Sequence, residues 1–233
     1  MRLTPQVITK APTVLNPEGQ LTLQLRNLQI PYIENLGITQ DKYTVIDLTN
    51  NDIIELANVP GNFTNLEVLL LANNNVAYID DNFPEENNLR SLSLINNNFS
   101  KIPLKAGQKL SVLENLALIG NPICKTQHYR EYIIWLIPSL KVLDFRKVKD
   151  AERTSAKALF GESHEELTEV ALSYLGKQAK AEEKPVQGAD KQLTSVGRKL
   201  SENEKKELMQ RLEHAESLDE IEEIERTLRE GKV

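Results

Sequence analysis

The amino-acid sequence predicts an α/β solenoid, in which short parallel strands and their return segments stack along one axis. The first observation is a spacing of apolar residues, L-x-x-L-x-L-x-x-N-x-L, that recurs four times between residues 43 and 123 with Ile, Val, Tyr or Phe in some apolar places. The second is the asparagine of each copy, because Asn51, Asn74, Asn97 and Asn121 lie 23, 23 and 24 positions apart. Four copies at nearly constant spacing indicate a repeated structural unit.

The spacing inside each copy indicates a strand that is followed by a turn. Alternate residues of a strand point to the same side, so Leu69 and Leu71 of the second copy both face inward. One such unit cannot bury its apolar face alone, and stacking the units builds a continuous core. A unit of about 20–29 residues with this pattern is the leucine-rich repeat. We therefore expect a leucine-rich-repeat solenoid of about five repeats, with caps at both ends, over residues 1–160.

The repeat asparagines are expected to be structural. Each stands where the chain leaves its strand, and its amide can bond backbone groups of its own turn and of the neighbouring turn. Such bonds would form a ladder along the solenoid. A polar loop residue could also contact a ligand, but the ladder accounts for all four asparagines at once.

Residues that alternate with the inward leucines are expected on the concave face of the sheet. There Leu70, Ile95 and Ile119 form an apolar stripe, which indicates a docked partner element such as a helix. The preference of strands for branched apolar side chains is the competing explanation. The candidate partner-binding residues of this face are Arg26, Asp47, Thr49, Leu70, Ala72, Ser93, Ile95, Ala117 and Ile119.

The N-terminal end of the solenoid carries a cap signal. Thr4 and Pro5 can begin a short helix, with threonine before the helix and proline in its first position. A degenerate first repeat follows, in which Leu28 replaces the asparagine. Terminal repeats need a cap because their outer side has no neighbour.

The C-terminal end is expected to be closed by helices. Residues 128–137 have apolar side chains at helical spacing, and Pro138 should end that helix. Between the two helices, Leu143 and Phe145 are expected as the inward pair of a longer last unit. A second helix is expected from about residue 150 to 160. Trp135 should help to close the core, since it is the single tryptophan of the chain.

The last third of the chain is expected to be a helical tail. Residues 161–180 should form a helical extension with an apolar stripe. Residues 181–199 contain proline and glycine with few apolar residues, which is typical of a flexible linker. Residues 200–233 hold two capping-box signatures and are expected to form a helical hairpin.

Composition limits the possible functions. The 233 residues are 40% hydrophobic and 27% charged, and the formal net charge is −6. Residues 1–160 carry 16 basic and 16 acidic side chains, whereas residues 161–233 carry 12 and 18, so the tail holds the whole net charge. An acidic chain is not a general nucleic-acid binder and would need a local patch or a basic partner. The single cysteine permits no disulfide framework, and no apolar run reaches membrane-spanning length, so we expect no membrane partner.

Basic residues gather in the C-terminal cap. They are Lys141, Arg146, Lys147, Lys149, Arg153 and Lys157. A solvated surface would explain such a cluster, and so would contacts to RNA phosphates. The candidate phosphate contacts are Arg146, Lys147, Lys149 and Arg153.

An enzymatic function is not expected. The sequence contains no glycine-rich phosphate loop, no cluster with metal-ligand spacing and no nucleophile elbow. His128, His164 and His214 are scattered along the chain. We therefore expect no catalytic residue, no metal site and no cofactor.

Two strings of residues closely resemble one family. The first is His128-Tyr-Arg-x-Tyr132-x-Ile134, then Pro138, then Val142-Leu-Asp-Phe145-x-Lys147-Val-Lys149-x-x-Glu152-Arg153. The second is Leu25-Arg26, then Ile30-Pro-x-Ile33-Glu-Asn-Leu-Gly37. They resemble the A-prime family of the U2 small nuclear ribonucleoprotein, and the similarity covers residues 1–160. Residues 215–228 also look like the distal end of that family, whereas the stretch between departs from it.

The resemblance implies a scaffold protein of the nucleus. In that family the concave face holds a helix of the B-double-prime protein, which is an RNA-recognition-motif protein. The pair binds stem-loop IV of U2 snRNA, and the particle recognises the branch site in pre-mRNA splicing. The implied partners are therefore an RNA-recognition-motif protein of the B-double-prime type, U2 snRNA through the complex, and other spliceosome proteins through the tail.

A different leucine-rich-repeat function remains as the alternative. Phosphatase regulatory subunits and acidic histone-binding nuclear proteins share this kind of cap. The former would have a longer repeat array and the latter a long acidic tail, and this chain has neither.

Overall fold

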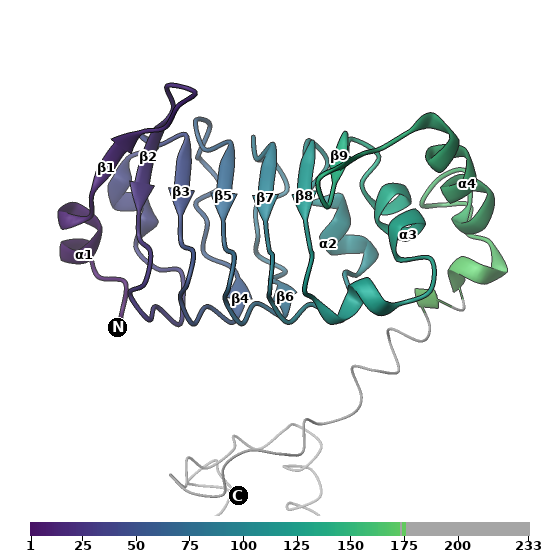
Figure 1. The fold of residues 1–233 in the computed structure, drawn as a ribbon, viewed down its shortest axis with the longest axis horizontal. Helices are drawn as coiled ribbons and strands as arrows, with labels where there is room; N and C mark the ends of the chain where they lie inside the picture. Colours follow the sequence, from purple (N-terminus) through teal and green to yellow (C-terminus); the bar gives the residue numbers. More distant parts are fainter. Residues whose placement is uncertain (173, 176–233) are drawn as a thin grey trace, which may run out of the picture. The chain divides into compact units, whose positions relative to one another are not determined.

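A sheet of eight short strands organises the described part of the chain, and six of these strands run parallel in chain order (Figure 1). The computed structural model describes residues 1–172 and 174–175. The parallel strands are β2 (Leu21–Gln24), β3 (Val45–Asp47), β5 (Val68–Leu70), β7 (Ser91–Ser93), β8 (Asn115–Ala117) and β9 (Val142–Leu143). Strand β1 (Thr13–Leu15) pairs antiparallel with β2, and β10 (Arg146–Lys147) pairs antiparallel with β9. The predicted solenoid is confirmed, with β2, β3, β5, β7 and β8 as repeat strands and β9 in the cap.

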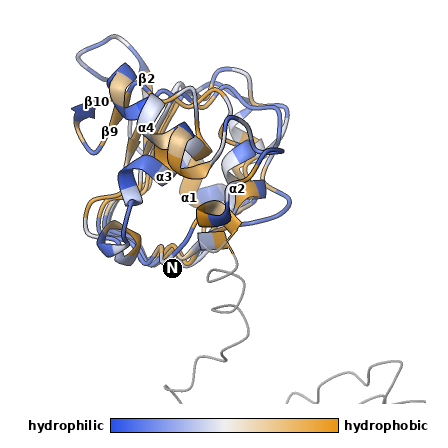
Figure 2. Cartoon of the chain, turned by 90° about the vertical axis from the view of Figure 1, so that its right-hand side faces the viewer, coloured by the Kyte–Doolittle hydropathy of each residue, from blue (hydrophilic) through white to orange (hydrophobic). Residues whose placement is uncertain are grey.

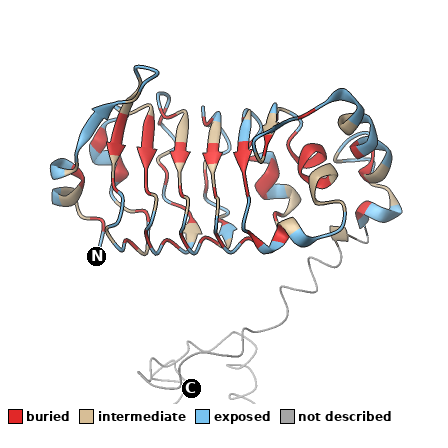
Figure 3. Cartoon of the chain, viewed as in Figure 1, coloured by how far each residue is buried: buried red, intermediate tan, exposed pale blue. Residues whose placement is uncertain are grey.

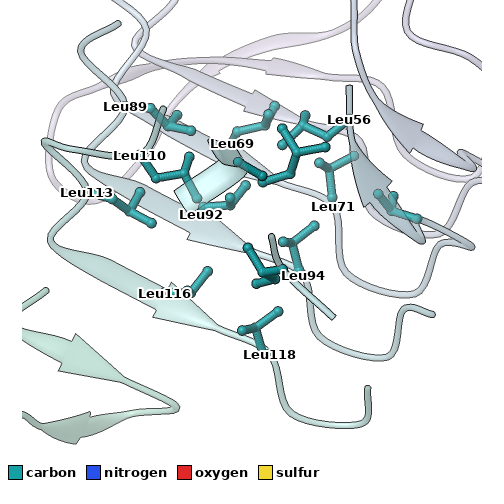
Figure 4. Close-up of a cluster of buried hydrophobic side chains, with 14 of the residues drawn as sticks. Leu56, Leu69, Leu71, Leu89, Leu92, Leu94, Leu110, Leu113, Leu116 and Leu118 are labelled. Carbon is teal, nitrogen blue, oxygen red and sulfur yellow. The ribbon is translucent and has the colours of Figure 1, made fainter. Parts of the chain in front are cut away.

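The inward residues keep one register along the sheet. Ile46 lies opposite Leu69, Leu69 opposite Leu92, and Leu92 opposite Leu116. All four are buried, and Figure 4 shows leucine side chains of successive repeats converging on one interior. Burial continues from strand to strand in Figure 3. Because each fully buried leucine contributes about 1.5–3 kcal/mol, the stacked rows supply the core that no single repeat could build.

The four repeat asparagines form the expected ladder. The Nδ2 of Asn74 donates to the carbonyls of Leu71 and Leu48, each at 3.0 Å, and its Oδ1 accepts from the Ile53 N–H at 3.0 Å. Related bonds are made by Asn51, Asn97 and Asn121. All four side chains are buried. They therefore satisfy backbone groups that the turns would otherwise leave without partners.

The return segments close the side of the solenoid opposite the sheet. They contain η1 (Leu36–Thr39), β4 (Glu55–Leu56), β6 (Tyr78–Ile79), α2 (Leu104–Gln108) and η2 (Pro122–Lys125). Strands β4 and β6 pair parallel with each other. Helix α2 approaches the C-terminal cap so closely that a Cβ on Gly107 would lie 2.3 Å from the Cγ of Leu136. Glycine at this position therefore permits the contact.

A helix and a hairpin cover the N-terminal end. Helix α1 (Pro5–Lys10) begins after Thr4, whose Oγ1 accepts the Val7 N–H at 3.4 Å. Leu3 and Ile8 are buried at this end of the core. The predicted cap helix is present. The antiparallel strand β1, which the repeat pattern does not predict, lies beside the first repeat.

Two helices close the C-terminal end, as the sequence predicts, and an aromatic cluster fills the space against them. Helix α3 (Tyr129–Leu136) packs against α4 (Asp150–Phe160), and Figure 2 views this end with hydrophobic residues on α3. The Tyr132 ring lies 5.4 Å from that of Phe160 and 4.6 Å from that of Tyr174. Trp135 is buried and donates from Nε1 to the Gly161 carbonyl at 2.9 Å.

The extension after α4 starts later than expected. The sequence predicts a helical extension over residues 161–180, but residues 162–166 form a bend and the helical residues begin at 169. The Ser163 hydroxyl accepts from the backbone N–H groups of Glu165 and Glu166, which favours the bend. Ala171 is buried against the cap. The predicted linker at 181–199 and hairpin at 200–233 lie outside the described residues.

Candidate functional site

The concave face gathers the nine predicted partner-binding residues. Asp47, Leu70, Ser93 and Ala117 lie side by side in one row, because their strands share one register. A second row follows two residues further along each repeat, where backbone bonds between neighbouring repeats continue. Its members are Arg26, Thr49, Ala72, Ile95 and Ile119. The structure therefore places all nine residues on neighbouring positions of one surface.

The apolar stripe is stepped rather than straight. Leu70 belongs to the first row, whereas Ile95 and Ile119 belong to the second. Ile119 is 43% exposed, and Leu70 and Ile95 are half-buried. Ala117 is buried, so it contributes little open surface. The exposed apolar surface therefore runs diagonally across three neighbouring repeats.

The concave face also has a third row, which the predicted set of partner-binding residues does not contain. Val45, Val68, Ser91 and Asn115 pair in register one repeat after another. They precede the inward residue of each strand, so the alternation rule already places them on the concave side. The predicted set contains only residues that follow the first inward position of each repeat.

The N-terminal part of the face carries an ion pair. Arg26 Nε lies 2.6 Å from Asp47 Oδ2, and Asp47 Oδ1 accepts the Thr49 N–H at 3.0 Å. Asp47 is only 5% exposed. Its carboxylate is therefore committed within the chain, while the half-exposed Arg26 side chain remains open to a partner. A groove of about 630 Å³ between α1 and the first repeat, lined in part by Val7, Lys10 and Arg26, continues this end of the face.

One margin of the face is an exposed ladder of asparagine side chains. Asn50 Nδ2 donates to Asn27 Oδ1 at 3.0 Å, Asn73 to Asn50 at 2.7 Å, and Asn96 to Asn73 at 2.8 Å. All four have a backbone φ between 52° and 58°, which asparagine adopts more readily than most residues. The ladder stops at Gly120, where a Cβ would lie 2.1 Å from Asn96 Oδ1. The Asn-Asn pairs at 50–51, 73–74 and 96–97 were the signal for this second ladder.

The opposite margin is a row of alternating charges. Arg90 lies 3.9 Å from Glu67 and 3.3 Å from Glu114, and Lys141 lies 2.8 Å from Glu114. The hydrogen bond from Lys141, together with both nearby cations, holds the pKa of Glu114 below its usual range despite partial desolvation. Lys141 is therefore engaged within the protein, although the sequence placed it in the basic cluster.

The four candidate phosphate contacts separate into two kinds. Arg146, Lys147 and Lys149 are exposed, and none of them makes an ion pair within residues 1–172 and 174–175. Figure 2 shows β10, which holds Arg146 and Lys147, as a hydrophilic margin of the cap. Arg153 instead donates to the carbonyls of Pro138, at 2.7 Å, and Leu140. All four residues lie close together in the sequence, so the sequence alone could not show that Arg153 binds backbone carbonyls while the other three cations are exposed.

The Asp144 carboxylate accepts a backbone hydrogen bond from the last repeat. In earlier repeats a backbone N–H such as that of Leu94 donates to the carbonyl of the next strand. At the end of the array the Leu118 N–H donates to Asp144 Oδ1 at 2.7 Å instead. Asp144 Oδ2 accepts from the Tyr129 hydroxyl at 2.9 Å, and burial together with this carboxylate raises the pKa of Tyr129. The Asp144 carboxylate therefore accepts the hydrogen bond that the carbonyl of a further repeat strand would otherwise accept.

The described residues contain no group of His, Cys, Asp and Glu that could hold a metal ion. Within the same part of the chain, no helix is long and apolar enough to cross a membrane. The surface features are a stepped apolar stripe, two polar margins and a group of open cations. This combination is suited to binding macromolecules.

Comparison with known proteins agrees with this description. The leucine-rich repeat family model matches residues 1–171. Proteins named U2 small nuclear ribonucleoprotein A′ from Candida albicans and Debaryomyces hansenii are 50% and 49% identical, and the alignments cover 100% and 99% of both chains. The crystal structure of the Drosophila melanogaster SNF/U2A′ complex matches with a TM-score of 0.66 at 35% identity, over 76% of this chain and 99% of that chain. The chain therefore belongs to the U2 small nuclear ribonucleoprotein A′ family.

Proposed function

We propose that this chain is a non-enzymatic scaffold subunit of the U2 snRNP that acts in pre-mRNA splicing in the nucleus. Its concave face binds a helix of an RNA-recognition-motif protein of the B-double-prime type, and the pair binds stem-loop IV of U2 snRNA. The observation that carries the proposal is the stepped stripe of Leu70, Ile95 and Ile119 on an open sheet face. Membership of the A′ family and the SNF/U2A′ complex of the Drosophila relative support it.

The spacing of the stripe suits a helix. Neighbouring strands lie about 4.8 Å apart, and side chains three or four positions apart on a helix are separated by about 5–6 Å. Successive apolar side chains of an amphipathic helix can therefore rest on successive strands. The diagonal step from Leu70 to Ile95 and Ile119 sets the direction of the docked helix across the sheet.

In the complex, the exposed cations of the cap contact the RNA. Arg146, Lys147 and Lys149 are exposed and free of ion pairs in the described structure. Cations of this kind hold phosphates without reading bases. Since the described repeat domain is close to neutral, the chain alone should bind RNA weakly, and the partner should supply most of the affinity and sequence specificity.

Ile119→Glu tests the proposed concave site. A carboxylate opposite a docked apolar helix would be buried without a partner, which costs several kcal/mol, so partner affinity should fall at least about 100-fold. Thermal stability should change little, because Ile119 is an exposed side chain in the free chain. Isothermal titration calorimetry of the full chain against the RNA-recognition-motif protein measures the affinity.

Ile38→Glu is the matched control for this experiment. Ile38 is 47% exposed, close to the 43% of Ile119, but lies in the return segment η1. Its substitution should leave partner affinity unchanged. Parental affinity in Ile119→Glu, or equal losses in both variants, would remove the concave face as the docking site.

A further inference from the structure

The hairpin between β9 and β10 presents an aromatic side chain to solvent. Leu143 pairs with Arg146, so Asp144 and Phe145 form a two-residue turn. Phe145 is 73% exposed, the largest exposure among the large hydrophobic residues of the described structure. Burial of the Phe145 ring therefore contributes little to the stability of the fold.

Folding alone does not account for phenylalanine at this position. Both turn residues have positive φ, 52° for Asp144 and 61° for Phe145. Two-residue hairpin turns of this kind favour asparagine and glycine, because bulky side chains are strained in the left-handed region. An exposed ring in a strained backbone position destabilises the fold without compensating burial. Such residues concentrate at functional sites.

The body of the protein holds this turn in place. Asp144 is fixed at both carboxylate oxygens by the Leu118 N–H and the Tyr129 hydroxyl. Arg130 donates from Nη1 to the Leu143 carbonyl at 3.0 Å, and from Nη2 to the carbonyls of Arg146 and Lys147 at 3.4 and 3.3 Å. The aromatic ring is thus carried on a preorganised support, which lowers the entropy that binding would lose.

Cations follow the ring directly. Arg146 and Lys147 are exposed, and their side chains make no ion pair within the described residues. An aromatic ring beside open cations is the arrangement by which proteins bind single-stranded nucleic acid, since the ring stacks on a base and the cations hold its phosphates. A protein anchor would be expected within a wider apolar patch, whereas the residues on either side of Phe145 are charged.

We propose that Phe145 is a stacking platform for an unpaired RNA base, with Arg146 and Lys147 holding the adjoining phosphates. This inference deepens the proposed function, on whose RNA contact it rests. It gives the cap a preference for unpaired over paired RNA, which phosphate contacts alone would not supply. Because every base has a π-face, the platform tolerates different bases.

The test uses the full chain at low ionic strength and a short single-stranded RNA that carries 2-aminopurine. Stacking of this base on Phe145 should quench its fluorescence. Phe145→Asn removes the ring and introduces a residue suited to the left-handed backbone. This variant should bind the RNA about 5- to 150-fold more weakly and abolish the quenching. Its thermal unfolding midpoint should equal or exceed that of the parent.

Two further variants separate stacking from other effects. Phe145→Tyr keeps an aromatic ring and should retain both affinity and quenching. Leu15→Asn removes an apolar side chain that is 70% exposed at the other end of the sheet, and should change neither. The same RNA annealed into a duplex should bind parent and Phe145→Asn equally.

Several results would overturn the stacking platform. They are an absence of quenching with the parent chain, parental RNA binding by Phe145→Asn, or equal dependence of paired and unpaired RNA on Phe145. A loss of partner-protein affinity without a loss of RNA binding would instead make Phe145 a protein anchor. Because the RNA titration contains no partner, its outcome is independent of whether Ile119→Glu supports the concave docking site.

Discussion

Single charged residues decide how the C-terminal cap is assembled. Arg130 Nε donates to Glu152 Oε1 at 2.6 Å, and Glu152 Oε2 also accepts the Lys149 N–H at 2.9 Å. The pair joins α3 to the start of α4 while Arg130 reaches the β9–β10 hairpin. The Arg130 guanidinium, which donates to the carboxylate, holds the pKa of Glu152 at about 2, below the usual 4.5, although burial opposes this shift.

The low pKa of Glu152 makes the cap sensitive to acid. A carboxylate whose pKa is lowered in the folded state stabilises the fold above about pH 4.5 and loses that contribution as pH falls toward 2. Glu152→Gln should therefore lower stability at pH 7 by about 1 kcal/mol, after allowance for solvent screening, and flatten the loss of stability between pH 4.5 and 2. Thermal unfolding across this pH range measures both effects.

Glu18→Gln provides the comparison, because Glu18 is exposed in the β1–β2 turn and makes no ion pair within the described residues. It should leave the acid profile unchanged. A parental slope in Glu152→Gln would show that Arg130 and Glu152 do not control the acid sensitivity.

Sequence reasoning was weakest for individual charges. Asp47 and Arg153 both read as open surface residues, yet one is buried in an ion pair and the other is tied to two backbone carbonyls. These roles depend on which groups the fold brings within about 3 Å. The spacing of residues along the chain contains no such distance. Asn51 and its equivalents were predictable because their partners recur with the repeat.

Among the elements of the cap, the β9–β10 hairpin and the residue before α4 carry the cations that we propose to contact RNA. Replacing Arg146, Lys147 and Lys149 with glutamine should weaken RNA binding by the complex. It should also flatten the log–log salt dependence by up to about 0.7–0.9 units for each lost phosphate contact. Partner binding should persist, because Ile119 and the rest of the stripe are unchanged. RNA titrations at several salt concentrations measure the slope.

A second triple variant controls for net charge. Lys42, Lys105 and Lys125 are exposed cations outside the hairpin and off the concave face, and changing all three to glutamine alters the charge of the chain equally. If this variant flattens the salt slope as much as the hairpin variant does, the hairpin has no specific phosphate contact.

Elements were predictable where a period defines them. The leucine spacing placed β3, β5, β7 and β8, and Pro138 with the helical spacing before it placed α3. Strands β2 and β9 continue the alternation of inward residues, but the hairpins β1–β2 and β9–β10 have no asparagine-glycine turn, so the sequence did not predict their antiparallel partners. The prediction that Phe145 points inward is wrong, because Asp144 and Phe145 form the turn and Phe145 is 73% exposed. The positive φ of Phe145 is imposed by the hydrogen bonds around its turn, and the side chain itself opposes that conformation.

At the scale of the molecule, residues after α4 belong to the core of the described unit. Tyr174 lies against Tyr132 and Phe160, and its hydroxyl is 2.8 Å from that of Thr126. A chain that ends after Leu175 should therefore unfold at the parental temperature and still bind the partner protein. Ending it after Phe160 removes Tyr174 and Ala171 and should lower stability by about 3 kcal/mol or more. Calorimetry measures the unfolding temperature of both truncated chains. If the chain that ends after Leu175 does not fold, the residues after Leu175 contribute to the core.

The antiparallel strands at the two ends of the sheet also govern self-association. A parallel stack of identical turns could in principle add the turns of another molecule and grow into a filament. Strand β1 has three residues and β10 has two, and both reverse the direction of the strand beside them. The terminal strand β10 also carries two cations, which discourage edge-to-edge pairing. The two ends thereby limit the described solenoid to a fixed length.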